Sequence, residues 1–256
     1  MSILSVFLGF LVGCLVAATG IGGGILLTPL LIVVLNASPV AAVGTALLFM
    51  SLTKVCASLF HCRQNTVHFR LSASLLLGSL PGAFAGSELL IFVRDRFGEG
   101  LNDGLRIAIG VCLIVFAMDS LVLESRRVFS PSSWRDGPLT VRELQKAIGI
   151  GFAGGFLVSL TSIGSGSLIM LLLLMSCRRS PARLVGTDIF HGMILTMVAA
   201  LFHSRIASPD LHLLGLLLIG SIPGAIVGVK VATLVESLWF RRALLVLSAV
   251  GGFMML

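Results

Sequence analysis

The sequence predicts an all-α polytopic membrane protein, and two observations carry this prediction. The chain of 256 residues is 57% hydrophobic and only 11% charged, whereas a soluble domain has about 25% charged residues. Apolar stretches of the length that a membrane-crossing helix needs fill most of the sequence. The net charge of +7 lies in short loops, which is typical of cytoplasmic loops and argues against nucleic-acid binding. We therefore expect a multi-pass protein of the plasma or inner membrane, surrounded by the lipid bilayer.

Apolar segments follow one another along the chain, and we expect about eight to ten of them to be helical. They cover residues 3–19, 25–36, 39–60, 71–93, 104–123, 146–162, 167–177, 182–202, 211–234 and 240–256. No basic stretch precedes the first segment, so we interpret it as a membrane helix and not as a cleaved signal peptide. The prediction is a single transporter domain over 1–256, with repeat 1 at 1–123, a cytoplasmic linker at 124–145 and repeat 2 at 146–256.

The two halves of the chain are copies of one another. A shift of 142 residues aligns 9–86 with 151–228 without a gap. The stretch "GIGGG" (20–24) then meets "SIGSG" (162–166), and "GSLPGAFAG" (78–86) meets "GSIPGAIVG" (220–228). Chance similarity between apolar helices would match leucines and valines, but not glycines and prolines in one register. The sequence therefore predicts an internal repeat.

The charges of the loops indicate that the repeats are inverted. In the first half, the loop before the third segment is uncharged at 36–38. The equivalent loop of the second half holds Arg178, Arg179 and Arg183. In the following loop the first half holds Arg63 and Arg70, whereas the second holds Arg205 together with Asp210. Equivalent loops have exchanged their positive charge, as expected for loops that face opposite sides of a membrane.

A glycine-rich break interrupts the helices near the start of each half. Inverted repeats with interrupted helices are a recurring transporter plan, with the substrate near the midplane. The N-termini of half-helices expose N–H groups and favour anions. We expect a site for a small oxyanion at the two breaks, formed by Gly22, Gly23 and Gly24 in one copy and by Gly164, Ser165, Gly166 and Ser167 in the other. The alternative is that these glycines only permit tight helix packing.

These residues resemble a known family. The broken "GIGGG" helix, the proline and the "GT" pair that follow it, the later "PG" pair and the degenerate second copy look like the TauE/SafE sulfite-exporter family of membrane permeases. The resemblance covers nearly the whole chain. It implies a permease for sulfite, sulfonates or related sulfur-containing anions, by export or uptake. The second copy departs from the glycine run at Ser165 and Ser167, which leaves the substrate open.

Further candidates lie in the third segment of each half. Thr45 and Thr187 each follow a glycine about two turns into the segment. Their hydroxyls could donate to a ligand, or bond back to their own helix.

Three ionisable residues in these segments occur in one copy only. Thr196 stands in the place of Lys54, Ala46 in that of Asp188 and Phe49 in that of His191. Ionisable groups inside a bilayer are costly and are functional candidates by default. Asp188 and His191 share one helix face, so we expect a proton relay with Lys54 as an attractive charge. A structural ion pair among the three is the alternative.

The most direct interpretation is an anion transporter that works by alternating access and is coupled to protons through this relay. A passive anion channel would share the fold and the site. An intramembrane serine hydrolase, built from Ser165, Ser167, His191 and His203, is disfavoured because the sequence has no G-x-S-x-G elbow. We therefore expect no enzyme, and the sequence contains no cofactor or metal-binding motif. A homo-oligomer is left open.

Overall fold

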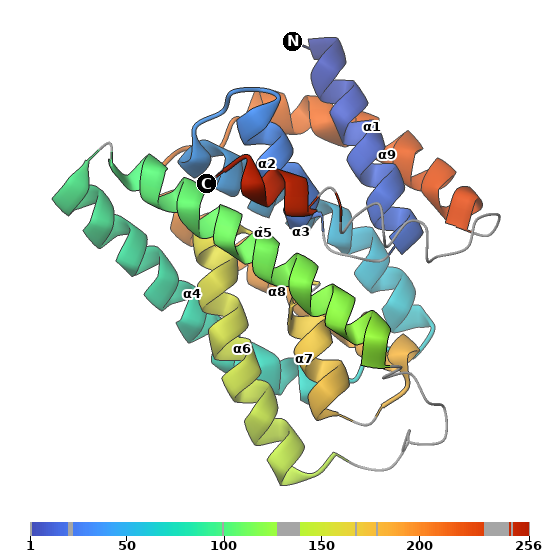
Figure 1. The fold of residues 1–256 in the computed structure, drawn as a ribbon. Coiled ribbons are helices and arrows are strands. Elements are labelled where there is room, and N and C mark those ends of the chain that lie inside the picture. Colours follow the sequence, from blue (N-terminus) through green and yellow to red (C-terminus); the bar gives the residue numbers. More distant parts are fainter. Residues whose placement is uncertain are drawn as a thin grey trace.

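The computed structural model describes residues 2–19, 23–98, 100–126, 139–166, 168–177, 179–232, 246 and 248–255. These residues contain helices and connecting turns and no strand, which confirms the all-α prediction. In chain order the helices are α1 (Ser2–Thr19), α2 (Gly24–Val33), α3 (Pro39–Arg63), α4 (Phe69–Phe97), α5 (Gly100–Arg126), α6 (Val141–Thr161), α7 (Leu168–Ser176), α8 (Pro181–His203) and α9 (Leu211–Ala232) (Figure 1).

Six of these helices are long and apolar enough to cross a membrane, namely α3, α4, α5, α6, α8 and α9. This confirms a multi-pass membrane protein. The helices α2 and α7 have 10 and 9 residues. At 1.5 Å per residue each is about 15 Å long, half the thickness of the hydrocarbon core, so neither can span the membrane alone.

The predicted breaks are present in both halves. One helix ends at Thr19 before α2 begins at Gly24, and the other ends at Thr161 before α7 begins at Leu168. The predicted linker at 124–145 is shorter in the structure, because α5 continues into it and α6 begins at Val141. A capping box starts α6 early: the backbone N–H of Glu143 donates to Thr140 Oγ1, and Glu143 accepts from the Thr140 N–H.

The first helix of each half packs against the fourth helix of the other half, so that α1 lies along α9 and α6 along α4 (Figure 1). A Cβ at Gly9 would meet the carbonyl of Leu217, and a Cβ at Gly151 would meet that of Leu75. The two contacts are related by the 142-residue shift, and further glycines repeat the pattern: Gly13 and Gly155, Gly220 and Gly78, and Gly224 and Gly82. A two-fold relation between the halves would produce this exchange; the inversion across the membrane stays a prediction.

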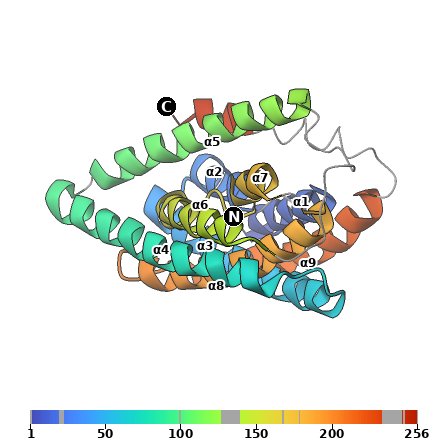
Figure 2. The same ribbon diagram turned by 90° about the horizontal axis from the view of Figure 1, so that it is seen from below.

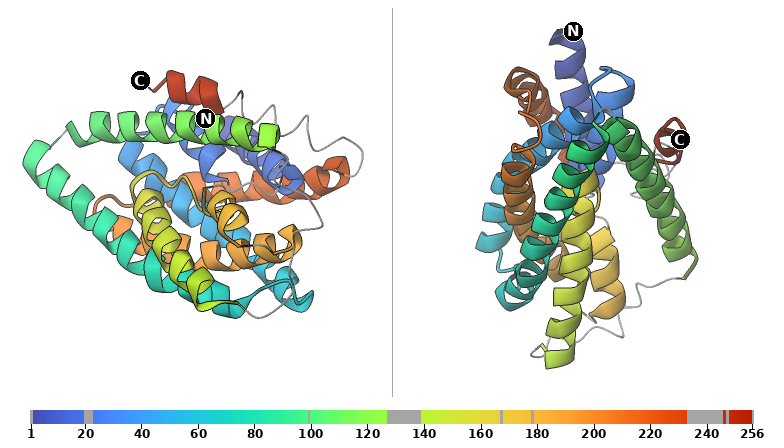
Figure 3. Two further views of the ribbon diagram at one scale, coloured as in Figure 1. Left: turned by 60° about the horizontal axis from the view of Figure 1, so that its bottom comes forward. Right: turned by 90° about the vertical axis from the view of Figure 1, so that its left-hand side faces the viewer.

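Helix α5 lies outside this pairwise arrangement, on the side of α2 and α7 (Figure 2). The helical residues 248–253 near the C-terminus lie across it (Figure 3). Gly252 makes this crossing close, since a Cβ there would lie 2.9 Å from Ile114 Cγ1 and 3.0 Å from the Gly110 carbonyl oxygen.

Charged side chains gather at the two ends of α4. At its start, Arg179 pairs with Glu143 at 3.6 Å, and burial together with the charges of Arg179 and Arg183 lowers the pKa of His68.

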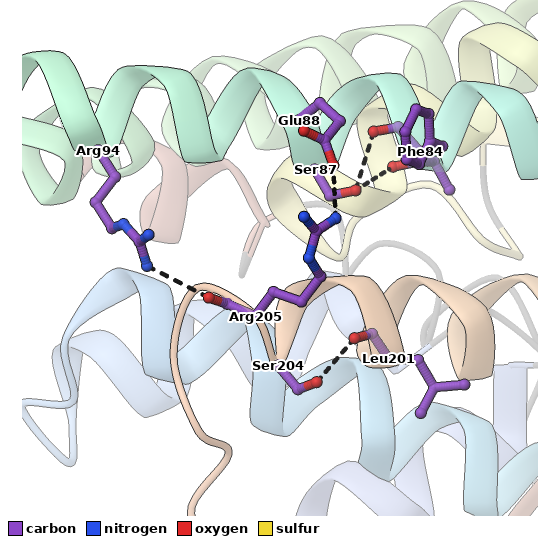
Figure 4. A network of polar contacts seen from close by, with 8 residues as sticks. Phe84, Ser87, Glu88, Arg94, Leu201, Ser204 and Arg205 are labelled. Carbon is purple, nitrogen blue, oxygen red and sulfur yellow. Dashed lines mark hydrogen bonds and ion pairs between the residues drawn. The ribbon is translucent and has the colours of Figure 1, made fainter.

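Towards the other end of α4, Arg205 pairs with Glu88 at 2.6 Å, and Arg94 donates to the Arg205 carbonyl at 3.4 Å (Figure 4). Arg94 also donates to the Ile206 carbonyl at 3.1 Å. Arg179 therefore lies near the start of α4, and Arg205 lies along its later turns. Which end of α4 faces the cytoplasm stays a prediction.

Candidate functional site

The structure brings the two glycine-rich breaks together. A Cβ at Gly24 would overlap the carbonyl oxygen of Ser162. One turn further along α2, the hydroxyls of Thr28 and Ser162 form a buried hydrogen bond. The first turn of α2 therefore rests directly on the C-terminal end of α6. Of the predicted tip residues, Gly22 and Ser167 lie outside the described part of the chain.

Glycine is needed at the two breaks for different physical reasons. In the second break Gly164 and Gly166 have φ values of +115° and +114°, a conformation that glycine adopts readily and other residues rarely do. In the first break Gly23 has an ordinary φ of −61°. Gly24 is required by close approach, because only a residue without Cβ fits against Ser162.

Lys54 reaches the second break from α3. Its Nζ donates to the Ser165 carbonyl oxygen at 3.0 Å and to Ser165 Oγ at 3.1 Å. The side chain is buried, with 9% of the residue exposed. An ammonium group has three N–H donors, and no described residue accepts a hydrogen bond from the third. The predicted attractive charge and the predicted tip serine therefore form one unit, with one donor to spare.

Asp188 and His191 lie beside this unit on one face of α8. Both are buried, and electrostatic interactions link Lys54 to each of them. His191 Nε2 lies 2.9 Å from Ser79 Oγ on α4. Among the described residues, Asp188 Oδ1 and His191 Nδ1 have no hydrogen-bond partner. Lys54 donates its hydrogen bonds to Ser165 and none to Asp188. Both the proton relay and a structural pairing among the three charges stay predictions.

The two predicted threonines lie away from the breaks. Thr45 Oγ1 accepts from the backbone N–H of Asp210 at 3.3 Å, just before α9. Thr187 Oγ1 accepts from the N–H of His68 at 2.9 Å, just before α4, and donates to the Arg183 carbonyl. These contacts are copies of one another under the 142-residue shift. They fasten the starts of α4 and α9, at opposite ends of the molecule.

Sequence reasoning missed three contributors to the site. Ser79 positions His191, Thr28 joins the two breaks, and Gly192 contacts the end of Lys54. Ser79 and its counterpart Ser221 are identical, so a comparison of the copies could not single it out. Gly192 could have been found, because the other copy carries Met50 at that position.

No group of His, Cys, Asp and Glu residues within the described ranges could hold a metal ion. The described residues gather an ammonium donor, a hydroxyl, a carboxylate oxygen and an imidazole nitrogen near the interrupted helices.

Comparison with known proteins gives consistent results over nearly the whole chain. The sequence model of the family "Sulfite exporter TauE/SafE" matches residues 5–255. The probable membrane transporter protein YjnA of Bacillus subtilis is 39% identical over 230 residues, which cover 89% of each chain. The probable membrane transporter protein YdhB of the same organism is 23% identical over 255 residues, 99% of each chain. No solved structure shows a significant match. The chain belongs to the TauE/SafE sulfite exporter family of membrane transporters.

Proposed function

We propose that this transporter carries a small sulfur-containing oxyanion, sulfite or a sulfonate, and binds it at Lys54 beside the second break. The observation that carries the proposal is the buried Lys54 ammonium, which holds Ser165 with two N–H groups and keeps a third. A buried charge is costly unless it is compensated. An anion that accepts from the third N–H would help to compensate this charge, together with the nearby carboxylate of Asp188.

The family supports the chemical class of the substrate. The matching family is described as sulfite exporters, and a sulfur oxyanion presents several acceptor oxygens around one centre. Lys54 would bind one of them, and the hydroxyl of Ser165 another. The N-terminal end of α7, which begins three residues after Ser165, adds the positive end of a helix dipole.

Transport by alternating access with proton coupling fits the remaining residues of the site. Asp188 and His191 are buried beside Lys54, and each has an atom without a hydrogen-bond partner among the described residues, which can take a proton. A proton bound there would change the charge around Lys54 and with it the affinity for the anion. We propose that this change couples anion movement to the proton gradient.

The test is flux into proteoliposomes that contain the purified protein. Sulfite, methanesulfonate, sulfate and chloride are offered separately, with and without a pH gradient. We expect saturable flux of sulfite or the sulfonate, and accumulation above equilibrium when the gradient is present. Flux that only runs downhill and ignores the gradient would identify a passive channel. Absence of flux for every sulfur oxyanion would refute the proposal.

Lys54→Met supplies the residue-level test, because methionine keeps most of the side-chain length and removes the charge. A hydrogen bond to a charged group is worth about 1.5–3 kcal/mol, so the apparent KM for the anion should rise by roughly ten-fold to a hundred-fold. An unchanged KM in a folded protein would place the site elsewhere.

A further inference from the structure

The end of the Lys54 side chain lies over a glycine of α8. Gly192 is buried, and a Cβ at this position would lie 2.5 Å from Lys54 Nζ, 3.5 Å from its Cε and 3.6 Å from its Cδ. These are the three nearest atoms, and all belong to Lys54. The absence of a side chain at residue 192 therefore makes room for the end of the Lys54 side chain.

The other copy fills the same position. Met50 is the counterpart of Gly192 under the 142-residue shift. Its sulfur lies 3.9 Å from Ser165 Oγ, and its Sδ and Cε would lie 3.0 Å from a Cβ at Gly24. A long apolar side chain thus covers the first break, in the place where a lysine at the position of Thr196 would need space.

The surroundings of the two breaks differ accordingly. The atoms nearest to a Cβ at Gly23 belong to Val16, Met50 and Phe49, all apolar. At the second break, the Ser165 carbonyl and hydroxyl both accept from Lys54. Both halves contain a helix interruption. Among the described residues, a charged side chain, Lys54, donates to the second break.

We propose that Gly192 is a positioning residue, which sets the Lys54 ammonium against Ser165 and thereby makes the transport site one-sided. The role of Lys54 toward the anion rests on the proposed function; the positioning itself does not. A methyl group at residue 192 needs an ordinary contact distance of at least 3.4 Å. The ammonium, at the end of a flexible side chain, would have to move by about 1 Å, and we expect this shift to lengthen its hydrogen bonds to Ser165.

Gly192→Ala tests the proposal, with Gly215→Ala as the matched control. Gly215 lies within α9, and a Cβ there would meet nothing within 4 Å. In proteoliposomes we expect Gly192→Ala to raise the KM for the transported anion by about ten-fold, with a maximal rate per inserted protein within two-fold of the original. Gly215→Ala should change neither. Equal KM values for the two variants would overturn the proposal.

A second measurement does not depend on transport. The melting temperature of the detergent-purified protein is compared for Gly192→Ala alone and in the Lys54→Thr background, which carries the residue of the other copy. We expect Gly192→Ala to lower the melting temperature only when Lys54 is present. The same loss in both backgrounds, or failure of both variants to insert, would show a general packing role and overturn the proposal. If no anion is transported but the coupling is observed, the proposed function fails and the positioning stands.

Discussion

Two neighbouring glycines of the first break should respond very differently to the same added methyl group. A Cβ at Gly24 would overlap the Ser162 carbonyl oxygen, a backbone atom that cannot swing away, and would lie 3.0 Å from Met50 Sδ. Overpacking typically costs 1–3 kcal/mol, and we expect Gly24→Ala to reach the upper end, about 3 kcal/mol. A Cβ at Gly23 would lie 3.5 Å from its nearest atom. The φ of Gly23 is −61°, which any residue can adopt. Gly23→Ala should therefore be neutral, or stabilising by about 0.4–1 kcal/mol through the unfolded chain.

The assay is thermal unfolding of each purified variant in one detergent, with the insertion level in membranes as a second readout. A change of 1 kcal/mol shifts the melting temperature by roughly 2–4 °C in a chain of this size. Gly24→Ala should thus melt about 6–12 °C lower, and Gly23→Ala within about 4 °C of the original. Gly23→Ser, which copies Ser165, belongs with the mild variant. Equal losses for Gly23→Ala and Gly24→Ala would refute the close packing of α2 on Ser162.

This result also decides how the breaks can be probed for anion binding. A bulky residue at Gly24 would disturb the contact with Ser162 whether or not an anion binds there. Loss of transport in Gly24→Val therefore says nothing about a ligand. Gly23 is the informative position, because its side-chain direction has ordinary van der Waals clearance.

Three further outcomes are expected. Asp188→Ala and His191→Phe, which install the residues of the other copy, should leave insertion near normal and remove the pH dependence of flux; a pH profile that survives both changes would exclude the relay. Ser165→Gly removes one hydrogen bond to Lys54 and should weaken the apparent anion affinity, measured as KM, by about 0.5–1.5 kcal/mol. An unchanged KM would mean that the Ser165 carbonyl alone holds the lysine. Glu88→Gln breaks an exposed ion pair with Arg205 and should lower stability by less than about 1 kcal/mol in the same melting assay; a larger loss would show that this pair locks the helix ends together.

Much of the fold was predictable because the sequence contains an internal repeat. The repeated glycine-rich stretches marked the ends of α1 and α6 and the starts of α2 and α7, and hydrophobic length identified the remaining helices. The ends of the linker were not predictable from hydropathy, because polar residues at 141–146 form the first turns of α6 behind the Thr140 cap. Local apolar pattern does not report a helix that extends beyond the lipid.

The site was predictable in part, and the limit has a physical cause. Lys54, Asp188 and His191 were found because each differs from its counterpart. That Lys54 binds Ser165, a residue 111 positions away, depends on how α3 packs against the second break, which no local pattern contains. The same limit explains Thr45 and Thr187: their hydroxyls bond to the backbone of loops in the opposite half.

The differences between the copies follow from the cost of buried charge. If Thr196 were a lysine, a second ammonium would lie at the pseudo-equivalent position within the same low-dielectric interior. Two like charges there would repel strongly. Thr196 instead donates to the carbonyl of Gly192 at 2.7 Å, so its hydroxyl is satisfied within its own helix. Packing can be duplicated freely, because each glycine contact at the α1–α9 interface stabilises independently of its copy at the α4–α6 interface. A buried cation cannot be duplicated in this way, which gives a physical reason why Lys54 has no charged counterpart in the second half.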